Sequence, residues 1–160
     1  MAAVQGSAIG GGLGLALSAD FRVAGSESRF AANFAAIGLH HGFGLTATLP
    51  RVVGQQRAWE MLYTGRRLTG IEASEIGLCD RLAPNDLIRA ETRKFAAEIA
   101  AAAPLAVRAI RETMRGDLPE VIRAATEREK TEQERLSVTH DFREGVRAAT
   151  ERRSPHFTGK

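Results

Sequence analysis

Apolar residues are distributed differently in the two halves of the chain. In the first half they form short runs separated by glycine and other small residues, and in the second half they recur every three or four positions. Short apolar runs bounded by turn residues are typical of buried strands, whereas the second spacing is typical of amphipathic helices. The sequence therefore predicts an α/β region followed by a helical region.

The first half contains few elements long enough to show a clear period. The predicted order is the end of a buried strand at Met1–Val4, a loop at Gly6–Gly12, a short apolar helix at Leu13–Ala19 and a strand at Phe21–Ala24. Phe30–Ile37 fits a strand and a short helix equally well, because its periodicity does not decide between them. Gly38–Gly44 is predicted to be a loop, with a helix resuming at about Leu45.

The second half predicts a series of helices, beginning with Gln55–Tyr63. Thr69 and Glu72 have the spacing of a capping box, in which each side chain accepts a hydrogen bond from the other residue's N–H, and that short helix is expected to end at Gly77. Asp117–Glu120 has the acid and proline of a helix start. Three apolar stripes predict core faces: Ile88, Thr92, Phe95, Ile99 and Ala103; Val107, Ile110 and Met114; and Val138, Phe142, Val146 and Ala149.

Thr126–Arg135 contains no apolar residue, and its charges can pair along a helix. We expect this stretch to be a solvated helix face, with a partner-binding or RNA-binding face as the alternative.

Composition and charge narrow the class of protein. The chain has 160 residues, 44% apolar and 26% charged, as expected for one soluble globular domain. Its net charge is only +3, and its basic residues are interleaved with acidic ones, so we expect no nucleic-acid partner. Cys79 is the only cysteine, which fits a reducing cytoplasm. The run Leu13–Leu17 is too short to cross a bilayer, so we expect no membrane partner.

Candidate chemistry lies in the glycine-rich stretch Gly6–Gly12. Three consecutive glycines before a helix allow backbone N–H groups to approach an anion or a developing oxyanion. The dinucleotide and phosphate-loop motifs both fail, because Leu15 and Gly12 occupy positions where those motifs need glycine and lysine. The alternative is a tight turn without a ligand.

Several segments, in order, resemble the crotonase (enoyl-CoA hydratase/isomerase) superfamily. Ala2–Gly12 resembles its A-x-V-x-G-x-A-x-G-G-G segment, and Asp20–Ala24 resembles the D-x-R-x-A strand that follows. Further resemblance is found at Phe30–Gly44, Thr64–Leu68, Ala73–Leu82, Pro104–Val107 and Glu144–Phe157.

This resemblance implies an incomplete β/α spiral core over residues 1–82 and a helical, oligomer-forming region over residues 83–160. It implies an acyl-CoA thioester as substrate, no cofactor apart from that coenzyme A, and a homo-oligomer that is a trimer or hexamer. Gly11 would donate one oxyanion N–H, with Gly10, Gly14 and Phe34 close to the substrate. Met1 corresponds to a position inside a family strand, so we expect either a true start upstream of Met1 or a fragment, and residues 1–160 are expected to lack the second oxyanion donor.

The sequence departs from the hydratase pattern at both acid positions. Gly14 and Phe34 stand where hydratases carry glutamate, and neither residue transfers protons. Thioester hydrolysis, isomerisation, decarboxylation and loss of activity stay open. His40 and His41 are candidate replacements, because histidine titrates near neutral pH.

Other polar residues are weaker candidates. Arg152 corresponds to a family residue that meets CoA phosphate, and Arg66 and Arg67 are further possible phosphate contacts. Asp20 is expected to hold the glycine loop through backbone N–H groups. The expected function is that of an enoyl-CoA hydratase/isomerase, of the lyase or isomerase class. The alternative is an inactive acyl-CoA-binding or oligomeric interaction protein.

Overall fold

The computed structural model describes all residues from Met1 to Lys160 and contains two small sheets. In the first sheet, β3 (Arg22–Ala24) lies between β1 (Ala2–Val4) and β6 (Arg81–Leu82), and the three strands are parallel. In the second sheet, β4 (Arg29–Ala31) lies between the parallel strand β2 (Ser7–Ile9) and the antiparallel strand β5 (Leu68–Thr69). Parallel neighbours require crossover connections, and helix α1 supplies the one from β1 to β3.

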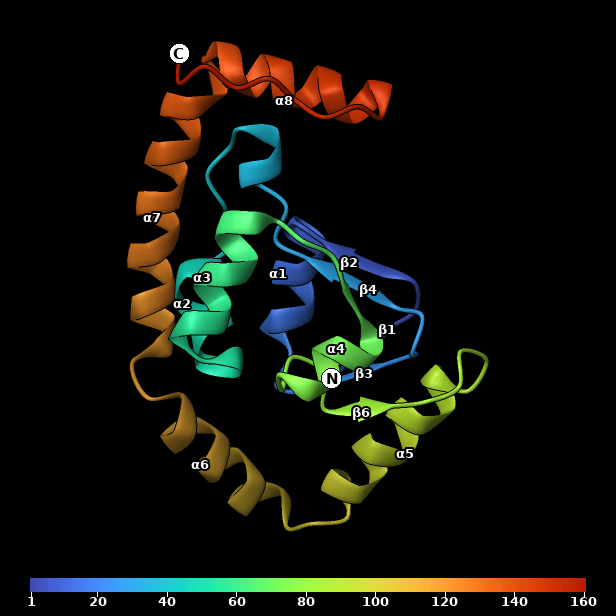
Figure 1. The fold of residues 1–160 in the computed structure, drawn as a ribbon. Coiled ribbons are helices and arrows are strands. Elements are labelled where there is room, and N and C mark those ends of the chain that lie inside the picture. Colours follow the sequence, from blue (N-terminus) through green and yellow to red (C-terminus); the bar gives the residue numbers. More distant parts are fainter.

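Helices account for most of the remaining chain. They are α1 (Gly11–Ser18), the 3₁₀ helix η1 (Ala35–Ile37), α2 (Leu45–Val53), α3 (Gln55–Thr64), α4 (Gly70–Glu75), α5 (Ile88–Ala100), α6 (Pro104–Arg115), α7 (Leu118–Ser137) and α8 (His140–Glu151). Helix α1 packs against β2 and α2 and lies at the centre of the molecule (Figure 1). Its Leu13 is fully buried with Phe30 of β4 and Leu45 of α2, and one apolar core joins both sheets to helices α1 to α4.

Most of the predicted elements are confirmed. The predicted helices at Leu45 and Gln55 begin at those residues, and α7 begins at Leu118. The capping box is present: Thr69 N–H donates to Glu72 Oε2 at 2.7 Å, and Glu72 N–H donates to Thr69 Oγ1 at 3.2 Å. The ambiguous stretch Phe30–Ile37 holds both alternatives, since it contains most of β4 and then η1.

The predicted loop Gly6–Gly12 is wrong. It contains β2 and the first turn of α1. The strand forms because Ser7–Ile9 pairs in register with Arg29–Ala31, a contact between distant segments that no local pattern marks. Gly6, at φ 82°, and Gly10, at φ 56°, flank it in conformations that favour glycine, which is why the stretch resembled a loop.

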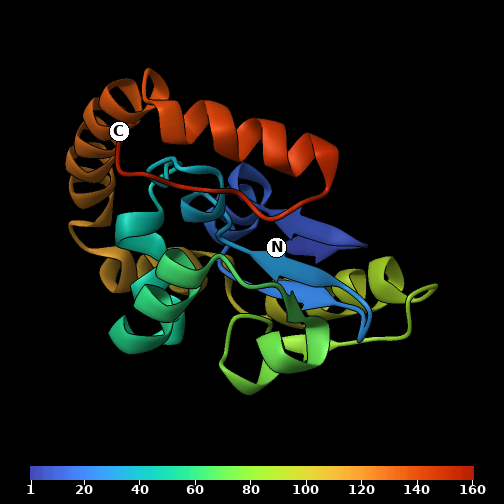
Figure 2. The ribbon, with the colours of Figure 1, turned by 45° about the horizontal axis from the view of Figure 1, so that its top comes forward.

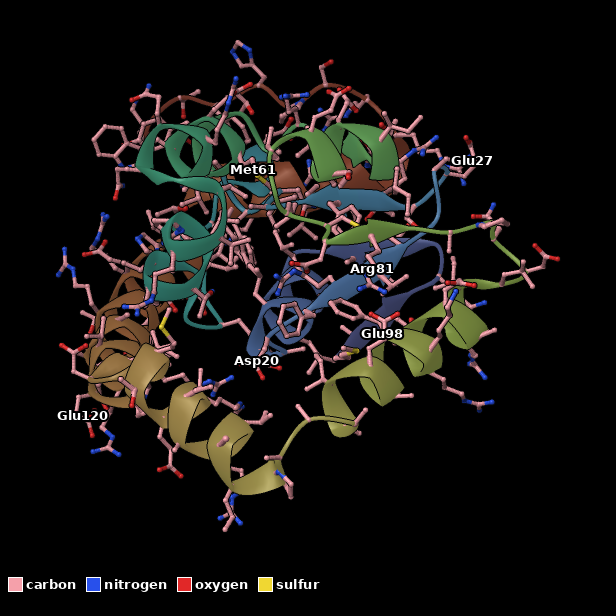
Figure 3. All side chains as sticks on the ribbon, turned by 90° about the horizontal axis from the view of Figure 1, so that it is seen from below. Asp20, Glu27, Met61, Arg81, Glu98 and Glu120 are labelled. Atoms are coloured by element: carbon pink, nitrogen blue, oxygen red, sulfur yellow. The ribbon has the colours of Figure 1, made fainter.

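The helices after β6 wrap around the core. Helix α7 runs beside α2, and α8 lies over η1 (Figure 1). The segment after α8 turns back along that helix (Figure 2), where Asp141 accepts hydrogen bonds from the N–H groups of Thr158 and Gly159. Arg81 of β6 and Glu98 of α5 point toward one another and form an ion pair of 2.7 Å (Figure 3).

Two of the three predicted core faces are wrong. The α5 face is correct, because Ile88 is buried and Phe95 and Ile99 are half-buried. On α6, however, Ile110 and Met114 are 61% and 74% exposed and line a groove of about 730 Å³ between α6, α5, α1 and α2. On α8 the buried residues are Gly145 and Ala148, because the helix approaches η1 so closely that only small residues fit.

Candidate functional site

The first turn of α1 presents backbone donors. Gly10 precedes the helix, and its N–H donates to Ala31 O at 2.8 Å, which ties the turn to β4. The N–H groups of Leu13 and Gly14 donate to Gly10 O, at 3.1 and 3.2 Å, whereas the exposed Gly11 donates its N–H to no backbone carbonyl. Such an unpaired N–H at the positive end of a helix suits an anion or an oxyanion.

Phe43 covers this turn from one side. A methyl group placed on Gly14 would stand 2.5 Å from Phe43 Cβ and 2.7 Å from its Cγ, so the ring occupies the space that a residue-14 side chain would need. A methyl group on Gly11 would lie 3.7 Å from Phe43 Cδ2, an ordinary contact. Phe43 has φ 65° and is 56% exposed, and both features are uncommon for a large aromatic residue.

Phe34 covers the same turn from the position before η1. Its Cζ would lie 3.6 Å from a methyl group on Gly10, and its ring packs against the apolar core. The structure thus places Phe34 beside Gly10, and Phe43 beside Gly11 and Gly14, at the start of α1. Phe43 was not predicted, although the absence of a side chain at Gly14 was a signal that a neighbour fills that space.

His40 and His41 form a stacked pair in the loop before α2, with ring centroids 4.1 Å apart. His40 Nδ1 donates to His41 O at 2.7 Å, and His41 Nε2 lies 2.8 Å from Thr46 Oγ1. Burial, and next the charge of His40, lower the pKa of His41 from 6.5 to about 4, although Glu129 opposes the shift. His41 is therefore neutral at pH 7.

Glu129 of α7 is the second residue that the sequence analysis missed. Its side chain is only 2% exposed, although it belongs to the apolar-free stretch predicted to be solvated. One carboxylate oxygen accepts from Gly44 N–H at 2.8 Å, and the other accepts from Thr46 N–H at 2.9 Å and from Thr46 Oγ1 at 2.7 Å. These donors compensate the burial of the Glu129 charge. They lie far from Glu129 in the sequence, so the residues around it gave no sign that it is buried.

The remaining candidates lie outside this cluster. Arg152 ends α8 and is exposed, with φ 53°. Arg66 forms ion pairs with Glu60 and Glu72, and Arg67 is exposed without an ion pair.

The expected role of Asp20 is wrong. Asp20 follows the far end of α1 (Figure 3). Its carboxylate pairs with Arg111 at 2.9 Å and Arg115 at 2.7 Å, and all three residues line the groove beside α6. Partial burial raises the pKa of Asp20, but these two arginines bring it below its ordinary value. The residue therefore ties α6 to the core and does not hold the glycine loop.

Taken together, fold and site define an α/β protein whose candidate centre consists of the backbone N–H groups at the start of α1 and the Phe34 and Phe43 rings beside them. The chain matches the family model for enoyl-CoA hydratase/isomerase over residues 1–160. It therefore belongs to that family, the crotonase superfamily.

Individual relatives agree with this assignment. The chain is 35% identical, over 161 residues, to the enoyl-CoA isomerase/hydratase fer4 of Mycosarcoma maydis and covers 59% of it. It is 38% identical to the putative enoyl-CoA hydratase/isomerase YngF of Bacillus subtilis and covers 61% of it. An enoyl-CoA hydratase/isomerase structure from Pseudoalteromonas atlantica superposes with a TM-score of 0.88 at 35% identity, over 98% of this chain and 63% of that one.

These relatives are longer than the chain, which spans about three fifths of their length. None of the helices combines the length and apolar composition that a membrane crossing needs.

Proposed function

We propose that this protein binds acyl-CoA thioesters and polarises the thioester carbonyl through the N–H of Gly11. The supporting observation is that Gly11 N–H is unpaired at the start of α1, at the position of a family oxyanion donor. A hydrogen bond to the carbonyl oxygen stabilises the enolate that forms when the neighbouring carbon loses a proton. The proposed activity is of the enoyl-CoA hydratase/isomerase type.

The aromatic residues at the acid positions argue against paired-carboxylate hydration. Phe34 stands at one acid position, and the Phe43 ring occupies the space beside Gly14 at the other. Neither ring takes or gives a proton, so water has no pair of bases to activate it. Proton transfer next to the carbonyl needs only one base, and His40 and His41 are the titratable groups of the adjoining loop. Isomerisation therefore suits this site better than hydration.

Hydrogen–deuterium exchange of butyryl-CoA tests the proposal. An enolate that forms and collapses in D₂O exchanges the protons beside the carbonyl without other chemistry, and mass spectrometry counts the deuterium gained. We expect calorimetric binding of butyryl-CoA together with exchange. Absence of binding overturns the proposal, and binding without exchange supports the inactive acyl-CoA-binding alternative.

Two substitutions at Gly11 isolate the backbone donor. Gly11→Pro removes the N–H at the first helical position, where proline is well tolerated. Gly11→Ala keeps the N–H and adds a methyl group at an ordinary 3.7 Å from Phe43. Loss of one oxyanion donor reduces rates by ~10²–10³, so we expect this reduction for proline and a near-normal rate for alanine. Equal rates in the two variants would contradict the assignment of Gly11.

One observation favours an oligomer. Ile110 and Met114, one turn apart on α6, are 61% and 74% exposed, and no residue of α6 is buried. An exposed apolar face of this kind marks an interaction surface. We propose that it contacts other copies of the chain in a trimer or hexamer.

Sedimentation measurements test the assembly. Ile110→Asp together with Met114→Asp should yield a monomer, whereas Arg108→Asp, on the same helix but outside the apolar face, should keep the wild-type mass. A wild-type chain that is monomeric at high concentration would refute the oligomer.

A further inference from the structure

The loop that carries the two histidines is fastened to α7. Glu129 and Gln133 stand one turn apart on that helix, and both contact the loop. Glu129 accepts from Gly44 N–H at 2.8 Å, and the Gln133 side-chain amide donates to His40 O at 3.0 Å. Gly42 has no side chain where a methyl group would stand 2.6 Å from the Gln133 amide nitrogen. Residues 40–44 of the loop are therefore held against α7.

The donors and acceptors available determine the direction of each hydrogen bond among His41, Thr46 and Glu129. Thr46 has one hydroxyl proton, and a carboxylate only accepts, so Thr46 Oγ1 donates to Glu129 at 2.7 Å. The same oxygen must then accept from His41 Nε2, 2.8 Å away. His41 consequently carries its proton on Nε2. Its Nδ1 has no hydrogen-bond partner within the chain and keeps a free lone pair.

The contact of this loop with α7 also sets the position of Phe43. Gly42 and Gly44 on either side of it both contact α7, and Phe43 itself turns to the opposite side with φ 65°. There its ring meets Gly14 and Gly11. A bulky residue keeps this conformation only where its surroundings impose it, and Glu129 supplies the strongest of those contacts.

We propose that Glu129 is a positioning residue of the candidate site: from α7, through Thr46, it holds His41 in the Nε2–H tautomer with Nδ1 free to exchange a proton, and it holds Phe43 over the first turn of α1. The inference rests on the proposed function for what His41 does, but not for how His41 is held. Residues of α7 thereby act on a centre whose backbone donor lies at Gly11.

Nitrogen-15 spectra of the imidazole rings test the inference directly, because they distinguish the two tautomers of neutral histidine. The sample is the full chain at neutral pH, and loss of a signal in His41→Gln assigns His41. We expect the Nε2–H tautomer in the wild type and in Thr46→Ser, which keeps the hydroxyl. Thr46→Val removes the hydroxyl but keeps the N–H bond to Glu129. We expect the Nε2–H tautomer of His41 to exceed the Nδ1–H tautomer by about tenfold in the wild type, and Thr46→Val to contain a mixture of the two.

Function provides the second measurement. If butyryl-CoA exchange is found, Thr46→Val should lower its turnover number while leaving KM close to that of Thr46→Ser, because binding through Gly11 is unchanged. If no exchange is found, the proposed function fails and the spectra still decide the inference. A wild-type His41 in the Nδ1–H form, or a Thr46→Val spectrum equal to that of the wild type, overturns it.

Discussion

Replacing Gly14 with alanine tests the placement of Phe43 against α1. Glycine inside a helix costs about 0.5–1 kcal/mol relative to alanine, so an unobstructed Gly14→Ala would raise the free energy of unfolding by that amount. Here the new methyl group would stand 2.5 Å from Phe43 Cβ and 2.7 Å from Cγ and Cδ1. Overpacking of this kind costs about 1–3 kcal/mol. We expect a net loss of about 0.5–2 kcal/mol, because the steric cost exceeds the gain in helix propensity.

The sign should reverse when Phe43 is removed. Phe43→Gly deletes the Cβ responsible for the 2.5 Å contact and suits the positive φ. In that background Gly14→Ala should raise stability by about 0.5–1 kcal/mol. Urea unfolding of the four chains of this cycle, at one protein concentration, gives the coupling energy. A Gly14→Ala effect of the same sign and size in both backgrounds would refute the contact.

Two further predictions concern the histidine loop and α8. Between pH 7 and pH 4 the unfolded chain protonates His41 near pH 6.5, but the folded chain does so only at about 4. Stability is therefore lost as the pH falls, by about 1–2 kcal/mol after allowance for partial exposure, and comparison with His41→Gln at each pH isolates this loss. Gly145→Ala would place a methyl group 2.4 Å from the Ile37 carbonyl, so α8 must move from η1. We expect a loss of about 1–3 kcal/mol in thermal unfolding, whereas the exposed Ala149→Ser should change little.

Local rules predicted those features whose causes lie close together in the sequence. The Thr69–Glu72 capping box and the helix start at Leu118 need only side chains and N–H groups within one turn, so their spacing was sufficient. Strand β2 was missed because three residues show no period, and its stability comes from pairing with Arg29–Ala31.

The two missed residues of the site share one physical cause. Glu129 meets Gly44 across 85 residues of chain, and its burial is compensated by donors from that distant loop and from Thr46 in the first turn of α2. Phe43 occupies the space left by the missing side chain at Gly14. The sequence alone does not show that these two residues, 29 positions apart, are in contact. A period counts apolar residues, and it therefore assigned the apolar face of α6 to the core. The charged stretch of α7 is mostly exposed, as predicted, but the pattern gave no sign that Glu129 within it is buried.

These contacts bear on how the chain is divided. A boundary between residues 82 and 83 stays a prediction, and it would separate a catalytic core from an assembling helical region. Glu129 and Gln133 lie beyond that boundary, yet they hold the loop that places Phe43 beside Gly11. If the inference about Glu129 is correct, residues 1–82 expressed alone would keep the glycine turn but lose the imposed conformation of Phe43. The helical region would then contribute to the site itself as well as to assembly.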